Sequence, residues 1–425
     1  MKKISKVKKI LSEQINFIKP EKEVFEKIKE ISLEFCLGLE KKLKAKKIKA
    51  EVFIGGSLAK GTLIKKDKYD IDIFIRFDEK YRDKDISGLL ESAIEKKARK
   101  IHGSRDYYQI ARGNTIIEII PVIKIKKPEE AGNITDLSYF HVNYVLAKIK
   151  KNKKLIDEIL FAKAFAHAQD CYGAESYIHG FSGYSLELLI IHYKTFLNFI
   201  KEITNSKINI REKLIIDERG FFGEKEKVLM EMNEAKLKSP IVLVDPTFKE
   251  RNVLAGLSKE TFLKFQEACR KFLEKPGPAF FKKKDILKEL KKYKNLKIIT
   301  VKTNKQEGDI AGTKSKKFFN FFISKSKKEF EVKKNVFDYN EYKNIAYFYL
   351  IVKKKKDEII RGPPITSAEN LTRFKEVHAN AFIEKQYAYA KISHDLSFEK
   401  FFKIFNKKEK KVMKDMGIEE MKLIK

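Results

Sequence analysis

Isoleucine occupies every second position of the segment DIDIFI, residues 70–75. This period of two predicts a β-strand with one apolar face, so Asp70 and Asp72 project from the opposite face. An apolar run at residues 52–54 predicts a preceding strand, and Gly55-Gly56-Ser57 predicts the turn that follows it. The pattern therefore predicts a strand–turn–strand unit that presents two carboxylates together.

Periodic segments in the rest of the chain predict both helices and strands. We expect helices at residues 1–50 (two, separated at Pro20), 87–100, 139–150, 154–169, 185–203, 258–273, 282–293, 312–324 and 368–378. We expect further strands at residues 107–110, 115–123, 241–245, 296–303, 329–332, 346–352 and 388–392. Pro276-Gly277-Pro278 is the clearest linker, and the chain beyond it is typical of a small α+β domain.

The carboxylates of Asp70 and Asp72 are candidate metal ligands. Residues i and i+2 of a strand lie roughly 6–7 Å apart, so two such side chains can converge on one cation. A solvated strand edge is the alternative, but the buried isoleucine face favours a functional placement. The turn at Gly56 and Ser57 offers backbone N–H groups and a hydroxyl that suit a phosphate. Phosphate beside a metal-binding pair indicates nucleotidyl or phosphoryl transfer.

Glu118 is the only charged residue in the predicted strand at 115–123, TIIEIIPVI. A lone carboxylate in a buried strand is costly unless it is paired or binds a metal. We therefore expect Glu118 to be a third ligand beside Asp70 and Asp72, with an edge position facing water as the alternative. Three such acids can hold two Mg²⁺ ions.

The charge of the chain favours a polyanionic partner. Its 425 residues contain 92 Lys and Arg against 59 Asp and Glu, a formal net charge of +33. Nucleic acid is the preferred partner over a membrane surface, and compositional bias does not explain the excess over acids. The three cysteines lack metal or disulfide spacing. No signal peptide or long apolar run is present, so we expect a cytoplasmic protein without membrane association, and leave open whether it is a homodimer.

Several blocks of the sequence resemble a known enzyme family. GGSLAKGT and DIDIF are similar to the motif shared by DNA polymerase β, poly(A) polymerases and CCA-adding enzymes. Four further blocks narrow the resemblance to one class of these enzymes. They are DLSYFH, YGAE followed by GFSGY, DP followed by ERNV, and RGPP. These blocks resemble the class I, archaeal-type CCA-adding enzymes, which are tRNA nucleotidyltransferases. They occur in that family's order across nearly the whole chain.

The resemblance implies an α+β multidomain fold and a reaction. It implies a polymerase β-like nucleotidyltransferase head of mixed sheet and helices (1–137), a helical neck and body (138–275), and a small α+β tail (276–425). It implies Mg²⁺-dependent addition of C, C and A to the 3′ end of tRNA from CTP and ATP, without a nucleic-acid template. The tRNA would lie along the basic body and tail.

The resemblance also assigns roles to particular residues. The metal carboxylates would be Asp70, Asp72 and Glu118, and the nucleotide-binding residues would be Gly56, Ser57, Lys60, His141, Lys163, Tyr172 and Arg251. Ser57 and Lys60 would bind phosphate, and Arg251 would help to read the incoming base. Lys60 and Glu118 stand where the family pattern has Arg and Asp. Lys offers a point charge in place of a fork of donors, and Glu moves the carboxylate outward.

Two other functions are compatible with the same residues. A poly(A) polymerase-like or oligoadenylate-type nucleotidyltransferase would use the same carboxylates but add a different product. A non-catalytic RNA-binding protein would use the basic charge alone. The number and identity of nucleotides added to a trimmed tRNA separates these alternatives.

Overall fold

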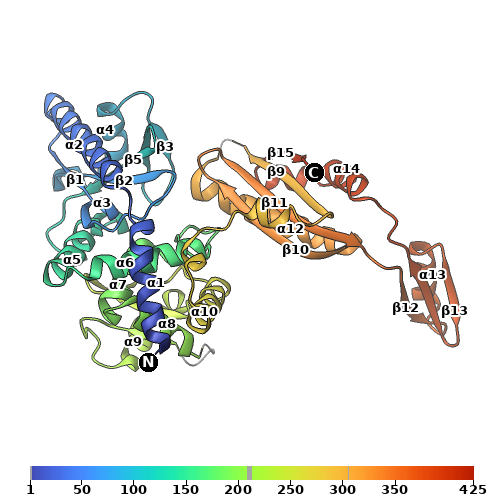
Figure 1. The fold of residues 1–425 in the computed structure, drawn as a ribbon. Helices are drawn as coiled ribbons and strands as arrows, with labels where there is room; N and C mark the ends of the chain where they lie inside the picture. The colour runs from blue at the N-terminus through green and yellow to red at the C-terminus, as the bar shows by residue number, and fades with distance from the viewer. Residues whose placement is uncertain (1, 208–212, 305) are drawn as a thin grey trace. The chain divides into compact units, whose positions relative to one another are not determined.

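The computed structural model describes residues 2–207, 213–304 and 306–425. The alternating segment forms strand β2 in a five-stranded sheet of order β1-β2-β5-β4-β3 (Figure 1). β2 runs parallel to β5, and every other neighbouring pair in this sheet is antiparallel. The strands are β1 (Ala50–Ile54), β2 (Tyr69–Phe77), β3 (Arg99–Ile101), β4 (Tyr107–Arg112) and β5 (Thr115–Ile123).

One face of this sheet is a hydrophobic core. Ile71, Ile73 and Ile75 are fully buried there, with apolar side chains of the helices α2 (Lys22–Ala45) and α4 (Ile86–Ala93). The burial of every second residue of β2 therefore confirms the predicted strand with one apolar face. Because the isoleucines take the core face, the carboxylates at positions 70 and 72 lie on the other face. That second face is the one available for chemistry.

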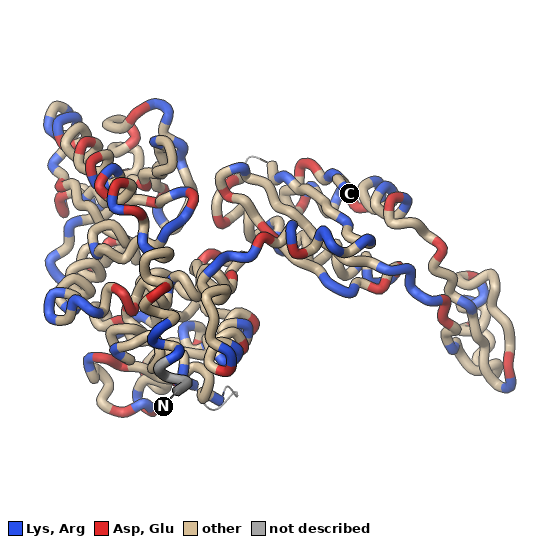
Figure 2. The backbone as a smooth tube through the Cα atoms, viewed as in Figure 1, with Lys and Arg blue, Asp and Glu red and all other residues tan. Residues whose placement is uncertain are grey.

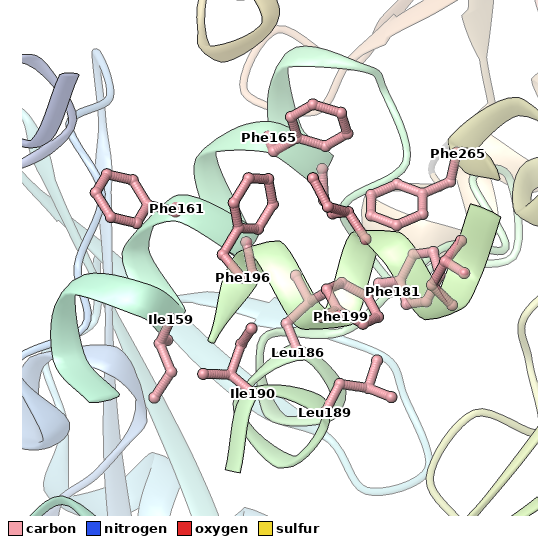
Figure 3. Close-up of a cluster of buried hydrophobic side chains, with 14 of the residues drawn as sticks. Ile159, Phe161, Phe165, Phe181, Leu186, Leu189, Ile190, Phe196, Phe199 and Phe265 are labelled. Atoms are coloured by element: carbon pink, nitrogen blue, oxygen red, sulfur yellow. The ribbon is translucent and has the colours of Figure 1, made fainter. Parts of the chain in front are cut away.

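A second hydrophobic core lies among the helices that follow the sheet. Phe165, Phe196, Phe199 and Phe265 are fully buried in it, and Figure 3 shows their rings gathered between the helices. The helices are α5 (Ser138–Lys151), α6 (Leu155–Ala168), α7 (Gly183–Tyr193), α8 (Phe196–Asn205), α9 (Lys225–Glu231) and α10 (Lys259–Glu274). The N-terminal helix α1 (Lys2–Ile18) also contributes apolar side chains to this core.

A small sheet completes the first part of the chain. Its strands are β6 (Leu214–Ile216), β7 (Ile241–Asp245) and β8 (Phe248–Asn252). β6 is parallel to β7, and β7 is antiparallel to β8. Short 3₁₀ helices are η1 (Glu79–Tyr81), η2 (Pro128–Glu130), η3 (Ile134–Leu137), η4 (Glu234–Leu237) and η5 (Pro278–Phe281).

The single helix expected at residues 185–203 is two helices, α7 and α8. Lys194 separates them with a positive φ of 68°, a conformation that an α-helix does not contain. Thr195 then begins α8, because its hydroxyl accepts a hydrogen bond from the backbone N–H of Asn198 at 3.1 Å. The hydrophobic pattern did not reveal this break, because the sequence is apolar on both sides of it. Thr195 was the available signal, since threonine is a frequent N-cap residue.

The chain forms two compact units, Met1–Lys284 and Asp285–Lys425. The first unit includes the Pro276–Pro278 segment and the residues directly after it. The reason is the packing of the next residues, because Phe280 and Phe281 lie with their ring centroids 6.1 and 5.8 Å from that of Phe165.

The described residues of the second unit form two antiparallel sheets. One has the order β10-β11-β9-β15 and the other the order β12-β14-β13. The strands are β9 (Leu296–Thr303), β10 (Phe330–Asn340), β11 (Ile345–Lys354), β12 (Glu358–Pro364), β13 (Ala381–Glu384), β14 (Tyr387–Ile392) and β15 (Ile418–Leu423). The helices are α11 (Ile286–Leu290), α12 (Gly308–Glu329), α13 (Ala368–Val377), α14 (Phe398–Lys408) and α15 (Lys410–Asp415).

Phenylalanines of α12 form the core of this unit. Phe318, Phe319 and Phe322 are buried with apolar side chains of the first sheet and of α14. These rings therefore pack in the hydrophobic core of the unit. The helix expected at 282–293 is shorter, because Asp285 caps α11 by accepting a hydrogen bond from the N–H of Lys288 at 2.9 Å.

Lysine and arginine are distributed along both units rather than gathered in one segment (Figure 2). In the part of the chain that the structure describes, no helix is long and apolar enough to cross a membrane.

Candidate active site

The turn between β1 and β2 brings backbone against a carboxylate. Gly56 begins the short helix α3 (Gly56–Lys60) with a φ of +58°, and a Cβ built on it would fall 1.7 Å from Oδ2 of Asp72. The N–H of Gly55 donates a 2.8 Å hydrogen bond to the carbonyl of Asp72. Only glycine combines this φ with so close an approach. The Gly-Gly sequence is therefore required by the position of Asp72.

Asp70 and Asp72 share the face of β2 that is opposite the isoleucine core. The Asp70 side chain is 40% exposed, and its Oδ2 lies 4.0 Å from Nζ of Lys66. Burial raises the pKa of Asp72 to about 6, with Lys60 opposing the shift and the charge of Asp70 adding to it. A cation between the two carboxylates would offset both effects.

Glu118 lies on the strand next to these aspartates. In the parallel β2–β5 pair Asp72 and Glu118 are direct neighbours, so their side chains leave the same face. Oε1 of Glu118 accepts a 2.8 Å hydrogen bond from Nε2 of Gln109, its antiparallel partner on β4. No three His, Cys, Asp or Glu side chains within the described ranges are grouped closely enough to hold a metal ion. The role of Glu118 as third ligand stays a prediction.

Lys60 and Lys163 meet at one buried carboxylate. Nζ of Lys60 lies 2.6 Å from Oε2 of Glu187, and Nζ of Lys163 lies 2.7 Å from Oε1. The hydroxyl of Thr62 donates to Oε1 of Glu187 at 3.0 Å and accepts from Lys163 at 2.9 Å. These groups come from α3, α6 and α7 and the segment after α3, so the cluster joins the sheet to the helices (Figure 1).

The pKa values of this cluster reflect burial and close charges. Burial would raise the pKa of Glu187, but the charges of Lys163 and Lys60 outweigh it and lower the pKa to about 2. Burial lowers the pKa of Lys163 to about 8, against the charge of Glu187 and together with that of Lys60. The cluster therefore has two lysines and one ionised carboxylate.

Glu187 was not among the residues that the sequence analysis singled out. It is the only charged residue between Leu186 and Ile191, in a helix that is otherwise apolar there. The same reasoning that drew attention to Glu118 applies to it, since an isolated carboxylate in an apolar run needs a partner. Lone acids in predicted core helices, as well as strands, are the signal that would have found it.

A second cluster surrounds the buried carboxylate of Asp245 at the end of β7. Nη1 of Arg251 lies 2.9 Å from Oδ2 of Asp245 and 3.0 Å from Nε2 of His141. Nε2 of His141 is also 3.0 Å from Oδ2 of Asp245. Burial would raise the pKa of Asp245, but hydrogen bonding to His141 and the charge of Arg251 lower it well below its ordinary value. Asp245 therefore holds the two residues together.

Tyr184 extends this cluster from helix α7. Its hydroxyl donates to Oδ1 of Asp245 at 3.0 Å, and its ring stacks on His141 with 4.3 Å between the centroids. Burial lowers the pKa of His141, while Asp245 opposes the shift and the positive charges of Arg251 and Lys60 add to it. Tyr184 and Glu187 lie on adjacent turns of α7, which thereby connects the two clusters.

Glycines in the GFSGY block let Tyr172 approach the lysine cluster. A Cβ on Gly180 would fall 2.3 Å from the carbonyl oxygen of Cys171, and a Cβ on Gly183 would lie 3.0 Å from the hydroxyl of Tyr172. Burial raises the pKa of Tyr172, and the charge of Glu187 adds to the shift. Nζ of Lys66 lies 5.2 Å from the centroid of the Tyr172 ring. Because Lys66 also approaches Asp70, this tyrosine belongs to the same site.

The donor set of β2 fits a hard divalent cation. Asp70 and Asp72 offer only carboxylate oxygens, which Mg²⁺ prefers over nitrogen or sulfur ligands. Mg²⁺ bound at proteins usually retains water and is completed by substrate phosphates. The charges of Lys60 and Lys163 act on Asp72, so the lysine cluster lies near this carboxylate.

Two family models match the chain. The nucleotidyltransferase domain matches residues 36–164, and the second domain of tRNA nucleotidyltransferases matches residues 157–282. The first match contains both aspartates and the second contains Glu187, Asp245 and Arg251.

Curated relatives cover most of the chain. A CCA-adding enzyme of Nanoarchaeum equitans is 34% identical over 379 residues, which are 86% of this chain and 88% of that protein. A CCA-adding enzyme of Methanocaldococcus jannaschii is 28% identical over 421 residues, covering 94% of this chain and 91% of that protein.

Among solved structures, Cid1 poly(U) polymerase bound to MgATP aligns with a TM-score of 0.51 at 15% identity, covering 65% of this chain and 98% of that chain. At this identity the likeness shows the fold alone, a nucleotidyltransferase fold of mixed α and β structure. The identity to the curated relatives, 34% over most of both chains in one case, supports a more specific assignment. The chain belongs to the family of CCA-adding enzymes, which are tRNA nucleotidyltransferases.

Proposed function

We propose that this protein adds C, C and A to the 3′ end of tRNA, using CTP and ATP and no nucleic-acid template. The observation that carries the proposal is that the charges of Lys60 and Lys163 act on Asp72, beside Asp70, in a chain related to CCA-adding enzymes over most of its length. The net charge of +33 supports binding of a polyanionic substrate such as tRNA.

Asp70 and Asp72 would hold Mg²⁺, with Glu118 as the adjacent carboxylate on β5. When bound, the metal supplies acidification of the 3′-hydroxyl and charge neutralisation on the phosphates. In the reaction a bond forms between the 3′-oxygen of the tRNA and the α-phosphorus. The bond from that phosphorus to the oxygen bridging the α- and β-phosphates breaks, the hydroxyl proton passes to water, and pyrophosphate departs. No side-chain general base is required.

Residues of the lysine cluster would bind the triphosphate. Lys60 and Lys163 together carry more positive charge than Glu187 neutralises, and this excess would offset charge that develops on the leaving pyrophosphate. The N–H of Gly56 and the hydroxyl of Ser57 would donate to phosphate oxygens at the start of α3. Tyr172 would contact the nucleotide beside them.

Arg251 and His141 would contact the incoming base. Asp245 fixes the guanidinium and the imidazole at 3.0 Å from one another, so both present a defined arrangement of hydrogen-bonding groups. A fixed arrangement discriminates between bases because the wrong base leaves polar groups unpaired.

We also propose a division of labour along the chain. Residues 1–137 would form the catalytic head, residues 138–275 the neck and body that contact nucleotide and tRNA, and residues 276–425 a tail that binds tRNA. The reaction with tRNA and nucleotides would take place in the cytoplasm.

Incorporation of labelled CTP and ATP into a tRNA trimmed of its 3′ end tests the proposal. We expect extension by two C and one A residues, followed by a stop. A long homopolymer would support the poly(A) polymerase-like alternative. Binding of tRNA without any incorporation, in the presence of Mg²⁺, would support a non-catalytic RNA-binding protein.

A further inference from the structure

Glu187 is a fully buried carboxylate in the helix α7. Its side chain has no solvent exposure, and its two oxygens are approached by the ammonium groups of Lys60 and Lys163 and by the hydroxyl of Thr62. A buried ion pair is weak evidence for stability, because hydrophobic residues of similar volume often replace such pairs at little cost. Stability therefore need not be the only reason for this arrangement.

The charge balance of the cluster points to another reason. Two buried lysines share one carboxylate, so the cluster carries a surplus of positive charge when both lysines are protonated. Lys60 and Lys163 are 7% and 1% exposed, so water screens their mutual repulsion poorly. Without Glu187 two ammonium groups would face one another in a buried site. One of them would then lose its proton or turn away.

The location of the cluster adds a second observation. Thr62 follows α3, which begins with the Gly56 turn against Asp72, and Lys163 lies 3.7 Å from the Cβ position of Gly183, beside the hydroxyl of Tyr172. The surplus positive charge therefore lies among the groups that surround the carboxylate pair.

We infer that Glu187 is a positioning residue for nucleotide binding: its carboxylate holds Lys60 and Lys163 side by side, charged and directed at the triphosphate. This inference rests on the proposed function, because the lysines must contact the phosphates of the incoming nucleotide. Glu187 itself touches no substrate. Its effect is transmitted through the lysines.

Substitution of Glu187→Gln tests this role, because it keeps the shape of the side chain and removes its charge. At pH 8 we expect the KM for CTP to rise by about tenfold or more, the effect of losing a hydrogen bond to a charged group, with a smaller change in kcat. Since the lysines would lose protons more readily in the variant, the increase in KM should diminish toward pH 6.5 and level off above pH 8, where Lys163 of the wild type also loses its proton. The affinity for tRNA should not change.

Glu158→Gln is the matched control. Glu158 lies on α6, is partly buried whereas Glu187 is fully buried, and accepts a 2.7 Å hydrogen bond from the backbone N–H of Phe196 instead of from a lysine. We expect this variant to lose some thermal stability and to keep the wild-type KM and pH profile. The same shift in both variants would show that a general loss of packing is responsible and would overturn the inference.

Two further variants keep the inference falsifiable if Glu187→Gln does not fold. Thr62→Val removes the hydroxyl that bonds both Glu187 and Lys163, and should raise the KM for CTP in the same pH-dependent manner but less. In a Lys163→Met background, Thr62→Val should add little, because residues that act through a common partner are not additive. Fully additive effects on KM would contradict a role through Lys163.

The outcomes separate this inference from the proposed function. A wild-type protein that fails to incorporate CTP into trimmed tRNA would overturn the proposed function. A wild-type protein that incorporates CTP, together with a folded Glu187→Gln variant of unchanged KM and pH profile, would overturn the inference alone.

Discussion

Gly56 lies directly against Asp72, so that a single added methyl group would overlap the carboxylate, 1.7 Å from Oδ2. The contact joins the candidate phosphate turn to the candidate metal ligand. We therefore expect Gly56→Ala to abolish nucleotide incorporation and to lower the melting temperature, because the side chain must displace Asp72 and adopt a φ of +58°.

Gly61→Ala is the control for this prediction. Gly61 has a similar φ of +65°, but nothing lies within 4 Å of the position of its Cβ. It should lose about 1 kcal/mol of stability from backbone strain and retain activity. Equal activities of the two variants would refute a functional contact between Gly56 and Asp72.

Asp70→Asn and Asp72→Asn should each reduce incorporation by at least about 100-fold, since stabilisation by a bound metal is worth several kcal/mol. Binding of tRNA, measured by filter retention, should persist. Asp67→Asn changes an exposed acid just before β2 and should retain wild-type activity. Loss of tRNA binding in the Asp70 and Asp72 variants would argue against a purely catalytic role.

Glu118→Gln tests the third carboxylate. If it completes the metal site, the variant should need more Mg²⁺ for half-maximal activity and lose at least about tenfold in rate. Gln109→Ala removes the observed hydrogen-bond donor but leaves the carboxylate, and should keep most of the activity. Unchanged metal dependence in Glu118→Gln would remove Glu118 from the metal site.

Arg251→Ala should weaken discrimination between bases more than it weakens catalysis. A lost hydrogen bond to a charged group is worth about 1.5–3 kcal/mol, so the ratio of kcat/KM for CTP over UTP should fall by about 10- to 100-fold. Lys249→Ala, an exposed basic residue on the same strand β8, should leave the ratio unchanged. An unchanged ratio in Arg251→Ala would exclude a role in base reading.

The acid stability of the protein should depend on Glu187. Burial would raise its pKa, but Lys163 and Lys60 lower it from 4.5 to about 2. The stabilisation from ionised Glu187 is therefore complete above pH 4.5 and is lost as the pH falls toward 2. Urea unfolding of the first unit between pH 3 and 6 should show a smaller pH dependence in Glu187→Gln. The same dependence of the unfolding free energy on pH in the wild type and in Glu187→Gln would contradict the lowered pKa of Glu187.

The hydrophobic pattern was sufficient for the elements that depend on local periodicity. The alternation of isoleucine in β2 predicted which face is buried, because a strand turns by half a revolution per residue. Glu118 of β5 is the register partner of Asp72 in the sheet, and its role as a ligand stays a prediction. The prediction of one long helix at residues 185–203 was wrong, because a hydrophobic pattern does not reveal a single residue with a positive φ, such as Lys194.

The sequence alone determined the family, the glycine turn and the carboxylate pair, since these lie within one short stretch or in blocks whose order is preserved. Only the tertiary structure decided how distant side chains pair. Lys60 and Glu187 are 127 residues apart, and no local pattern relates them. Their pairing follows from the packing of α3 and α6 with α7, because burial removes water and leaves each charge dependent on the partner that the fold brings to it.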